Sequence, residues 1–228
     1  MAAAAVVLVL AAPARAQVGV NLSAVTDYRY RGASLSDDRP AASLSVTYDH
    51  PTGLYAGARL VASQPRGRDL QVMGYMDYAG YAVRPGDSVA IDVGAINYHL
   101  TSYRFGERTV DYSEVYAGVV GDHLSAHLYY APNYHHSGIR TLYAELGGGV
   151  RATSRLKLFG HVGVLAPVGG RSGPQTRKER YNLKAGAALY LGAAELNLSW
   201  TLLTPPYVPR ARGGEPASKV AAGVALFF

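Results

Sequence analysis

The sequence predicts an all-β protein, an antiparallel transmembrane β-barrel of about twelve strands. Two observations carry this prediction. Apolar residues recur at every second position over stretches of about ten residues, and the chain ends on an alternating segment that closes with Phe228. Only 17% of the 228 residues are charged. The mean hydropathy of +0.01 is nevertheless too low for a bundle of membrane helices, and the 49% hydrophobic content argues against disorder.

The N-terminus predicts export. Residues 1–12 are almost purely apolar, and small residues around Arg15 follow them, which is typical of a signal peptide that is removed before Gln17. We therefore expect a signal peptide over 1–16 and an outer-membrane barrel over 17–228. The absence of Lys or Arg before the apolar run is unusual for such a peptide. With no cysteine, disulfides, thiol nucleophiles and cysteine-based metal sites are excluded.

The strands follow from the alternation taken along the chain. In residues 194–203, three leucines and Trp200 alternate with polar residues, so that one side of the segment is entirely apolar. Segment 180–191 shows the same pattern. The expected strands are 18–30, 41–50, 54–63, 69–83, 88–99, 110–120, 123–132, 139–151, 155–165, 180–191, 194–203 and 218–228.

The connections between these strands alternate in length. Short turns rich in Gly, Pro and Asp alternate with longer polar loops near 31–40, 64–68, 100–109, 133–138, 166–179 and 204–217. Strands of about ten residues with short turns at one rim and long loops at the other are typical of outer-membrane barrels. Both termini would then be periplasmic, and the strand that ends in Phe228 would be recognised by the barrel-assembly machinery. A secreted soluble β-protein, whose apolar side points inward, is the alternative.

The charged residues of the strands fall on one face, which predicts a polar lumen. A charge in the lipid is costly, so we assign the charged face to the interior. Asn97 shares the apolar face of its strand, so it must lie at the headgroup rim, or the fifth strand contains a bulge or has a shifted register. The expected pore-lining residues are Arg29, Asp49, Arg59, Asp77, Asp92, Glu114, Glu145, Arg151, Lys157 and Lys184.

These charges are unevenly distributed over the strands. Asp77, Asp92 and Glu114 come from the fourth to sixth strands, and Arg151, Lys157 and Lys184 from the eighth to tenth. Opposed acidic and basic arcs could orient a polar solute in a constriction. The alternative is a network of ion pairs that plugs the lumen.

The predicted loops hold the excess of positive charge. A basic rim could pair with the phosphates of lipopolysaccharide, so we expect lipopolysaccharide and outer-membrane lipids as partners. Because these residues are dispersed over several loops, nucleic-acid binding is not expected. The basic residues are Arg39, Arg66, Arg68, Arg104, Arg108, Arg171, Arg177, Lys178, Arg180, Arg210 and Arg212.

One stretch resembles a known family. The run Asp27-Tyr28-Arg29-Tyr30-Arg31-Gly32, followed by Ser34, Ser36-Asp37-Asp38, Pro40-Ala41 and then Gly53-Leu54-Tyr55-Ala56-Gly57, resembles the start of the TorF-type porins, also called Gcw_chp. Looser matches follow along most of the mature chain. Asn182 departs from the acidic residue expected after Tyr181. The resemblance implies an outer-membrane barrel that acts as a porin.

Three functions follow as expectations. The first is a narrow channel for passive passage of small polar solutes, because twelve strands leave less room than the sixteen of wide porins. The second is a non-conducting structural or adhesion barrel, and the third is a barrel lipid hydrolase. A hydrolase needs an interfacial Ser–His pair, whereas His123, His127 and His161 are expected to face the lumen. We therefore expect no enzyme activity, no cofactor and no metal site.

Overall fold

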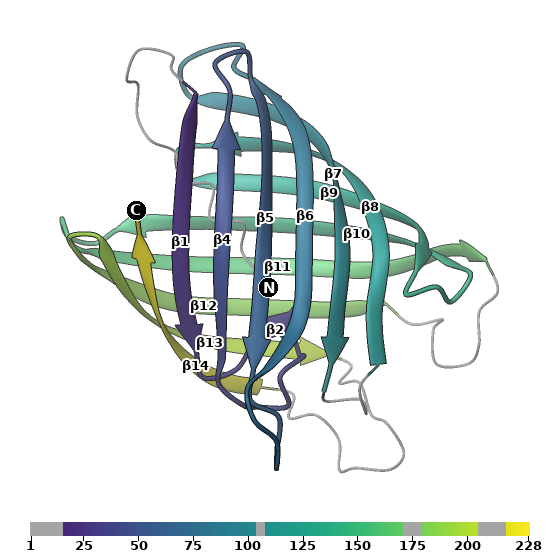
Figure 1. Cartoon of the computed structure of the whole chain (residues 1–228). Coiled ribbons are helices and arrows are strands. Elements are labelled where there is room, and N and C mark those ends of the chain that lie inside the picture. The colour runs from purple at the N-terminus through teal and green to yellow at the C-terminus, as the bar shows by residue number, and fades with distance from the viewer. Residues whose placement is uncertain (1–15, 104–107, 171–178, 205–217) are drawn as a thin grey trace.

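The computed structural model is a closed barrel of twelve antiparallel strands around a short inner hairpin (Figure 1). The structure describes residues 16–103, 108–170, 179–204 and 218–228, so most of the predicted signal peptide lies outside the described residues. The barrel strands are β1 (Gln17–Val25), β4 (Ala41–Asp49), β5 (Leu54–Ser63), β6 (Gln71–Val83), β7 (Val89–Ser102), β8 (Arg108–Gly121), β9 (Leu124–Tyr134), β10 (Ile139–Arg151), β11 (Leu156–Gly170), β12 (Arg180–Leu191), β13 (Ala194–Thr204) and β14 (Ser218–Phe227), and the hairpin consists of β2 (Arg29–Tyr30) and β3 (Ala33–Ser34).

The barrel closes through its first strand. β1 pairs with β4 on one side and with β14 on the other, so that Leu22 lies opposite both Leu44 and Leu226. The N–H of Phe228 donates to the carbonyl of Val20 at 2.9 Å and so extends this pairing to the last residue. The predicted twelve-strand antiparallel barrel is confirmed. The described residues contain no helix long and apolar enough to cross a membrane.

The barrel carries its apolar face outward. In β13, Leu198 is 56% exposed whereas its neighbour Ser199 is only 5% exposed. Because an apolar exterior around a polar interior suits hydrocarbon rather than water, this barrel belongs in a bilayer. The soluble alternative, which requires the opposite arrangement, is thereby excluded. Closed barrels of this kind are proteins of the bacterial outer membrane.

The two rims of the barrel differ as the sequence predicts. Connections of two to five residues join the strands at one rim, which we call the turn end. The other rim, the loop end, carries the four longest connections, beginning with residues 26–40, whereas the connections between β7 and β8 and between β9 and β10 at this rim have only five and four residues. Both ends of the barrel sheet lie at the turn end, where Gln17 pairs with Asp49 and the N–H of Phe227 donates to Ala193.

The first strand is shorter than predicted. We expect a strand over 18–30, but β1 ends at Val25, and the chain then turns into the barrel. Residues 26–40, which we call the inner segment, contain the β2–β3 hairpin, and residues 27–32 are all buried. The alternating pattern of residues 26–30 predicts that the strand continues. The chain turns inward instead because of contacts across the lumen, which a local sequence pattern does not reveal.

The second difference is a bulge in β6. The pairing of β5 with β6 shifts between Val61 and Ala62, opposite Gly74, whose φ of +130° few other residues could adopt. Beyond the bulge the faces are exchanged: Tyr75 is 48% exposed and Met76 is 4% exposed. Asp77 therefore points outward, and its assignment to the lumen is wrong. The predicted bulge in the strand of Asn97 lies instead in the neighbouring strand.

Candidate functional site in the barrel lumen

The inner segment is held in shape by its own polar side chains. The Arg29 guanidinium pairs with Asp27 at 2.7 Å and donates to the carbonyl of Gly32 at 3.0 and 2.7 Å. The hydroxyls of Ser34 and Ser36 donate to Asp27 as well. Every one of these groups is buried, so the bonds among them offset the loss of water. The segment therefore enters the lumen as a compact hairpin.

Arg31 fastens the hairpin to the wall at β8. Its guanidinium donates twice to the carboxylate of Glu114, at 2.9 and 2.6 Å, and both side chains are buried. The same guanidinium lies 3.8 Å from the ring centroid of Tyr143 on β10. A bidentate ion pair stacked on an aromatic ring is among the strongest anchors available to a buried arginine.

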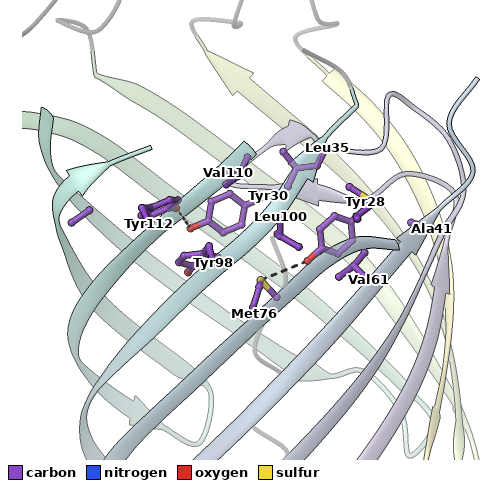
Figure 2. Packing of buried hydrophobic residues seen from close by; sticks show 12 residues of the cluster. Tyr28, Tyr30, Leu35, Ala41, Val61, Met76, Tyr98, Leu100, Val110 and Tyr112 are labelled. Atoms are coloured by element: carbon purple, nitrogen blue, oxygen red, sulfur yellow. Dashed lines mark hydrogen bonds between the residues drawn. The ribbon is translucent and has the colours of Figure 1, made fainter. Parts of the chain in front are cut away.

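Tyrosines pack the hairpin against the neighbouring strands (Figure 2). The hydroxyls of Tyr30 and Tyr112 lie 2.7 Å apart, and the Tyr98 ring stacks on Tyr112 with centroids 4.8 Å apart. The hydroxyl of Tyr28 donates to the sulfur of Met76 on β6 at 3.9 Å. Burial raises the pKa of the Tyr30 phenol well above its usual value, so this group stays neutral in the lumen.

The hairpin also reaches the opposite wall. A Cβ on Gly32 would lie 3.0 Å from the Cβ of Asn182 on β12 and 3.2 Å from that of Leu203 on β13. Closer to the loop end, Asp38 pairs with Lys219 on β14 at 3.4 Å. The inner segment therefore crosses the lumen from β6–β8 to β12–β14 and narrows it.

A second network lines the wall from β5 to β10. His127 lies between two carboxylates, 3.2 Å from Asp92 and 3.9 Å from Glu145. The Tyr55 hydroxyl donates to Asp92 at 3.0 Å, and that of Tyr129 donates to Glu145 at 3.1 Å. These lumen carboxylates are therefore hydrogen-bonded to protein donors, of which His127 alone can carry a compensating positive charge.

His161 continues this network onto β11 and β12. Its Nε2 lies 3.1 Å from the Tyr143 hydroxyl and 3.0 Å from Oδ1 of Asn182. Asn182 is 4% exposed and lies beside Gly32. The neutral amide thus supports the inner hairpin without placing another negative charge there.

The lumen cations are less well neutralised. Arg59 on β5 donates to Ser45 at 2.7 Å, and the Lys184 ammonium lies 5.5 Å from the centroid of the Phe159 ring. Within the described residues, no carboxylate oxygen lies within 4.0 Å of the charged nitrogens of Arg59, Lys184 or Lys157. Asp49 and Glu195 lie near the turn end. The middle of the lumen therefore carries unpaired positive charge.

The predicted site is thus only partly correct. Asp77 is outside, Asp92 and Glu114 are paired, and Arg151 is exposed at the turn end, so the two opposed arcs of charge do not exist. Arg29 lies in the lumen, but on the inner segment rather than on a strand. Inward positions are held by Asp49, Arg59, Asp92, Glu114, Glu145, Arg151, Lys157 and Lys184.

Several residues of the site were not singled out from the sequence as lumen residues. Arg31 contributes to the family resemblance, and its neighbours in the lumen, Tyr112, Tyr143 and Asn182, are distant from it in sequence. The charged residues Asp27 and Arg29, which stand two positions apart shortly before Gly32, are the local signal that the strand ends early. Six of the eleven predicted loop cations fall outside the described residues.

Nowhere in the described chain do three or more His, Asp or Glu side chains form a metal-binding group.

One histidine faces outward and also escaped the sequence prediction. His99 Nδ1 lies 3.0 Å from Asp111 Oδ1 on the lipid-facing side of β7 and β8. Among the described residues no serine or threonine hydroxyl is hydrogen-bonded to this ring, so the activated nucleophile that a lipid hydrolase requires is missing there. His127 and His161 face the lumen as predicted.

A family model matches residues 11–193, a range that contains the whole inner segment. The chain belongs to the Gcw_chp family. That family is described as bacterial proteins of unknown function, and the TorF designation stays a resemblance. No curated protein matches the chain.

Solved structures show the same fold. The NanC porin superposes with a TM-score of 0.59 at 10% identity, over 93% of this chain and 99% of that one. The KdgM porin gives a TM-score of 0.55 at 11% identity, over 92% and 99%. KdgM in complex with disordered oligogalacturonate gives 0.52 at 9% identity, over 92% and 99%. At these identities the likeness concerns the fold.

Proposed function

We propose that this protein is an outer-membrane channel through which small polar solutes pass passively, and that its lumen favours anions. The observation that carries the proposal is the unpaired positive charge of Arg59 and Lys184 within the barrel. An ionised group without a counter-charge is very costly in a dry interior, so these cations require water or a solute beside them. A hydrated lumen is what a channel needs.

The inner segment sets the size limit in this proposal. Because it is tied to both walls, a solute must pass beside it rather than through the full bore. The remaining lumen cations would attract an anionic or polar solute to this narrow level, as rings of charge do in other pores. The oligogalacturonate named with KdgM is an acidic sugar chain, and it supports an anionic solute class as the choice to test.

The second candidate is a non-conducting structural barrel. The observation that favours it is the same crossing of the lumen by the inner segment, fixed by Arg31 on one side and packed beside Asn182 on the other. Lipid hydrolysis has no such support, and we expect purified protein to release no fatty acid from phospholipid.

Liposome swelling separates the two leading candidates. We expect liposomes with the purified protein to swell faster in galacturonate than in galactose, which is similar in size but uncharged, and faster in both than empty liposomes. Equal rates with and without protein would support the structural barrel instead. Equal swelling rates in the two sugars, both faster than in empty liposomes, would support a channel but contradict its preference for anions.

Two partners complete the proposal. The last strand, β14, is followed directly by Phe228, which is 75% exposed, and would be recognised by the barrel-assembly machinery during insertion. The loop end would face the cell exterior, where basic loop residues such as Arg66 could pair with lipopolysaccharide phosphates. The turn end, with both termini, would then be periplasmic.

A further inference from the structure

The outward face of β6, β7 and β8 carries polar side chains on an otherwise apolar exterior. Nδ2 of Asn97 donates to Asp77 at 2.8 Å, and the Ser113 hydroxyl donates to Oδ1 of Asn97 at 2.7 Å. One residue pair nearer the loop end, His99 contacts Asp111. We call these five residues the outer polar patch. They are brought together by the strand register alone.

The depth of this patch makes it unusual. Asp77 is the middle residue of β6, and Asn97 lies five residues before the end of β7. Polar groups facing lipid cost more the nearer they lie to the bilayer midplane. Other parts of the exterior avoid them: the outward residues of β12–β14 between the rims are Leu183, Ala185, Ala187, Leu189, Leu196, Leu198, Trp200, Leu202, Val220, Ala222, Val224 and Leu226.

The surface around the patch is shaped for close approach. Four alanines occupy outward positions beside Asp77 and Asn97: Ala58 lies in the same row of the sheet, and Ala56, Ala79 and Ala95 form the next row toward the turn end. Small residues let two membrane-embedded backbones come close together. On the loop-end side of Asp77 and Asn97, beside the bulge, lies a groove of about 300 Å³ lined by Val72, Tyr75, His99, Thr101, Thr109 and Asp111. Such a groove can receive a protruding side chain.

We propose that the outer polar patch is the interface of a homodimer in the membrane. Two copies insert with the same orientation, so their twofold axis runs along the membrane normal and the same surface meets itself. Asn97 lies on the middle strand of the patch. Its amide retains one N–H and one oxygen lone pair after bonding Asp77 and Ser113. Two such amides can exchange hydrogen bonds, so the centre of the patch is complementary to itself.

A second copy also removes the patch from lipid on both protomers at once. Within each protomer the Asp77 carboxylate is already hydrogen-bonded to the amide that lies at the centre of the patch. A lipid headgroup would have to supply donors at the depth of the middle of β6, which lies away from the headgroup layer. The chemistry therefore favours another copy of this chain.

Cross-linking in native outer membranes tests the dimer. Because the chain has no cysteine, Ala95→Cys introduces a single thiol beside Asn97. The matched control is Ala222→Cys, an outward alanine on β14. With a short bismaleimide we expect a product of twice the protomer mass at least tenfold more abundant for Ala95→Cys. Equal yields, or a product with a protein of another mass, would overturn the proposal.

A second variant tests the role assigned to the amide. In the Ala95→Cys background, Asn97→Leu should lower the dimer yield at least tenfold, while heat-modifiable migration on gels shows that the barrel is intact. The control Asn197→Leu changes an inward amide on β13 and should leave the yield unchanged. An unchanged yield with Asn97→Leu would contradict the proposed interface.

Discussion

Arg31 and Glu114 form a buried bidentate ion pair that fixes the inner segment to the barrel wall. The two residues are 83 positions apart in sequence, and their side chains are 6% and 0% exposed. Breaking such a pair from one side is strongly destabilising, because the remaining charge stays buried without a partner. This contact therefore determines how firmly the lumen is narrowed.

Weakening this pair should loosen the inner segment. Glu114→Gln keeps the shape and an acceptor oxygen but removes the charge, which should cost about 1–3 kcal/mol of local stability. A thiol placed on the segment by Ala33→Cys should then react with a soluble maleimide roughly tenfold faster or more. Glu195→Gln, near the turn end, is the control. Equal labelling rates in both variants would show that the pair does not hold the segment.

Gly32 is the point where the hairpin meets the far wall. Its φ of +83° favours glycine, and a side chain would press on Asn182 and Leu203. Gly32→Val should displace the hairpin and cost about 1–2 kcal/mol for the backbone alone, visible as a changed single-channel conductance. Gly67→Val has a similar φ of +73° but no atom within 4 Å of its Cβ, and should leave conductance unchanged. The same conductance for both variants would contradict this contact.

The lumen cations should set ion selectivity. We expect Lys184→Gln combined with Arg59→Gln to lower the ratio of chloride to potassium permeability by about twofold or more, because both remove positive charge from the lumen. The reversal potential in a potassium chloride gradient measures this ratio. Arg155→Gln, an exposed residue at the turn end, should not change it. Selectivity that is the same in all three proteins would exclude the two cations as its source.

The bulge in β6 depends on Gly74. A Cβ at this position would overlap the carbonyl oxygen of His99, and its φ of +130° is strained for other residues. Gly74→Ala should therefore lower the temperature at which the folded barrel loses its heat-modifiable migration, whereas Gly86→Ala, with open space around it, should not. An unchanged temperature for Gly74→Ala would mean that β6 does not need the bulge, and would contradict the outward orientation of Asp77 that depends on it.

The barrel was predictable because its determinants are local. Alternation in β12 and β13 reports which face of each strand meets lipid, and the Gly and Pro turns mark where strands end. The inner segment was not predictable in this way. Whether Arg31 lies in a loop or in the lumen depends on Glu114 and Tyr143, which the chain brings near only after the barrel closes.

The error at Asp77 has a different origin. Up to Val72, the outward residues of β6 follow the register that the sequence predicts, and one extra residue, Met73 beside Gly74, exchanges the faces from Tyr75 onward. A single bulge therefore reverses every later assignment in its strand. Asn97 was the visible sign of this, because its polar side chain on the lipid face requires a neighbour such as Asp77.

Single-channel recording in planar bilayers tests most directly whether the barrel is a channel narrowed by its inner segment. We expect the purified wild-type protein to give discrete conductance steps. A variant in which a short Gly-Ser linker replaces residues 27–38 should give steps several-fold larger, with the barrel still heat-modifiable on gels. If neither protein conducts, the barrel is not a channel; if both conduct equally, the inner segment does not narrow the path.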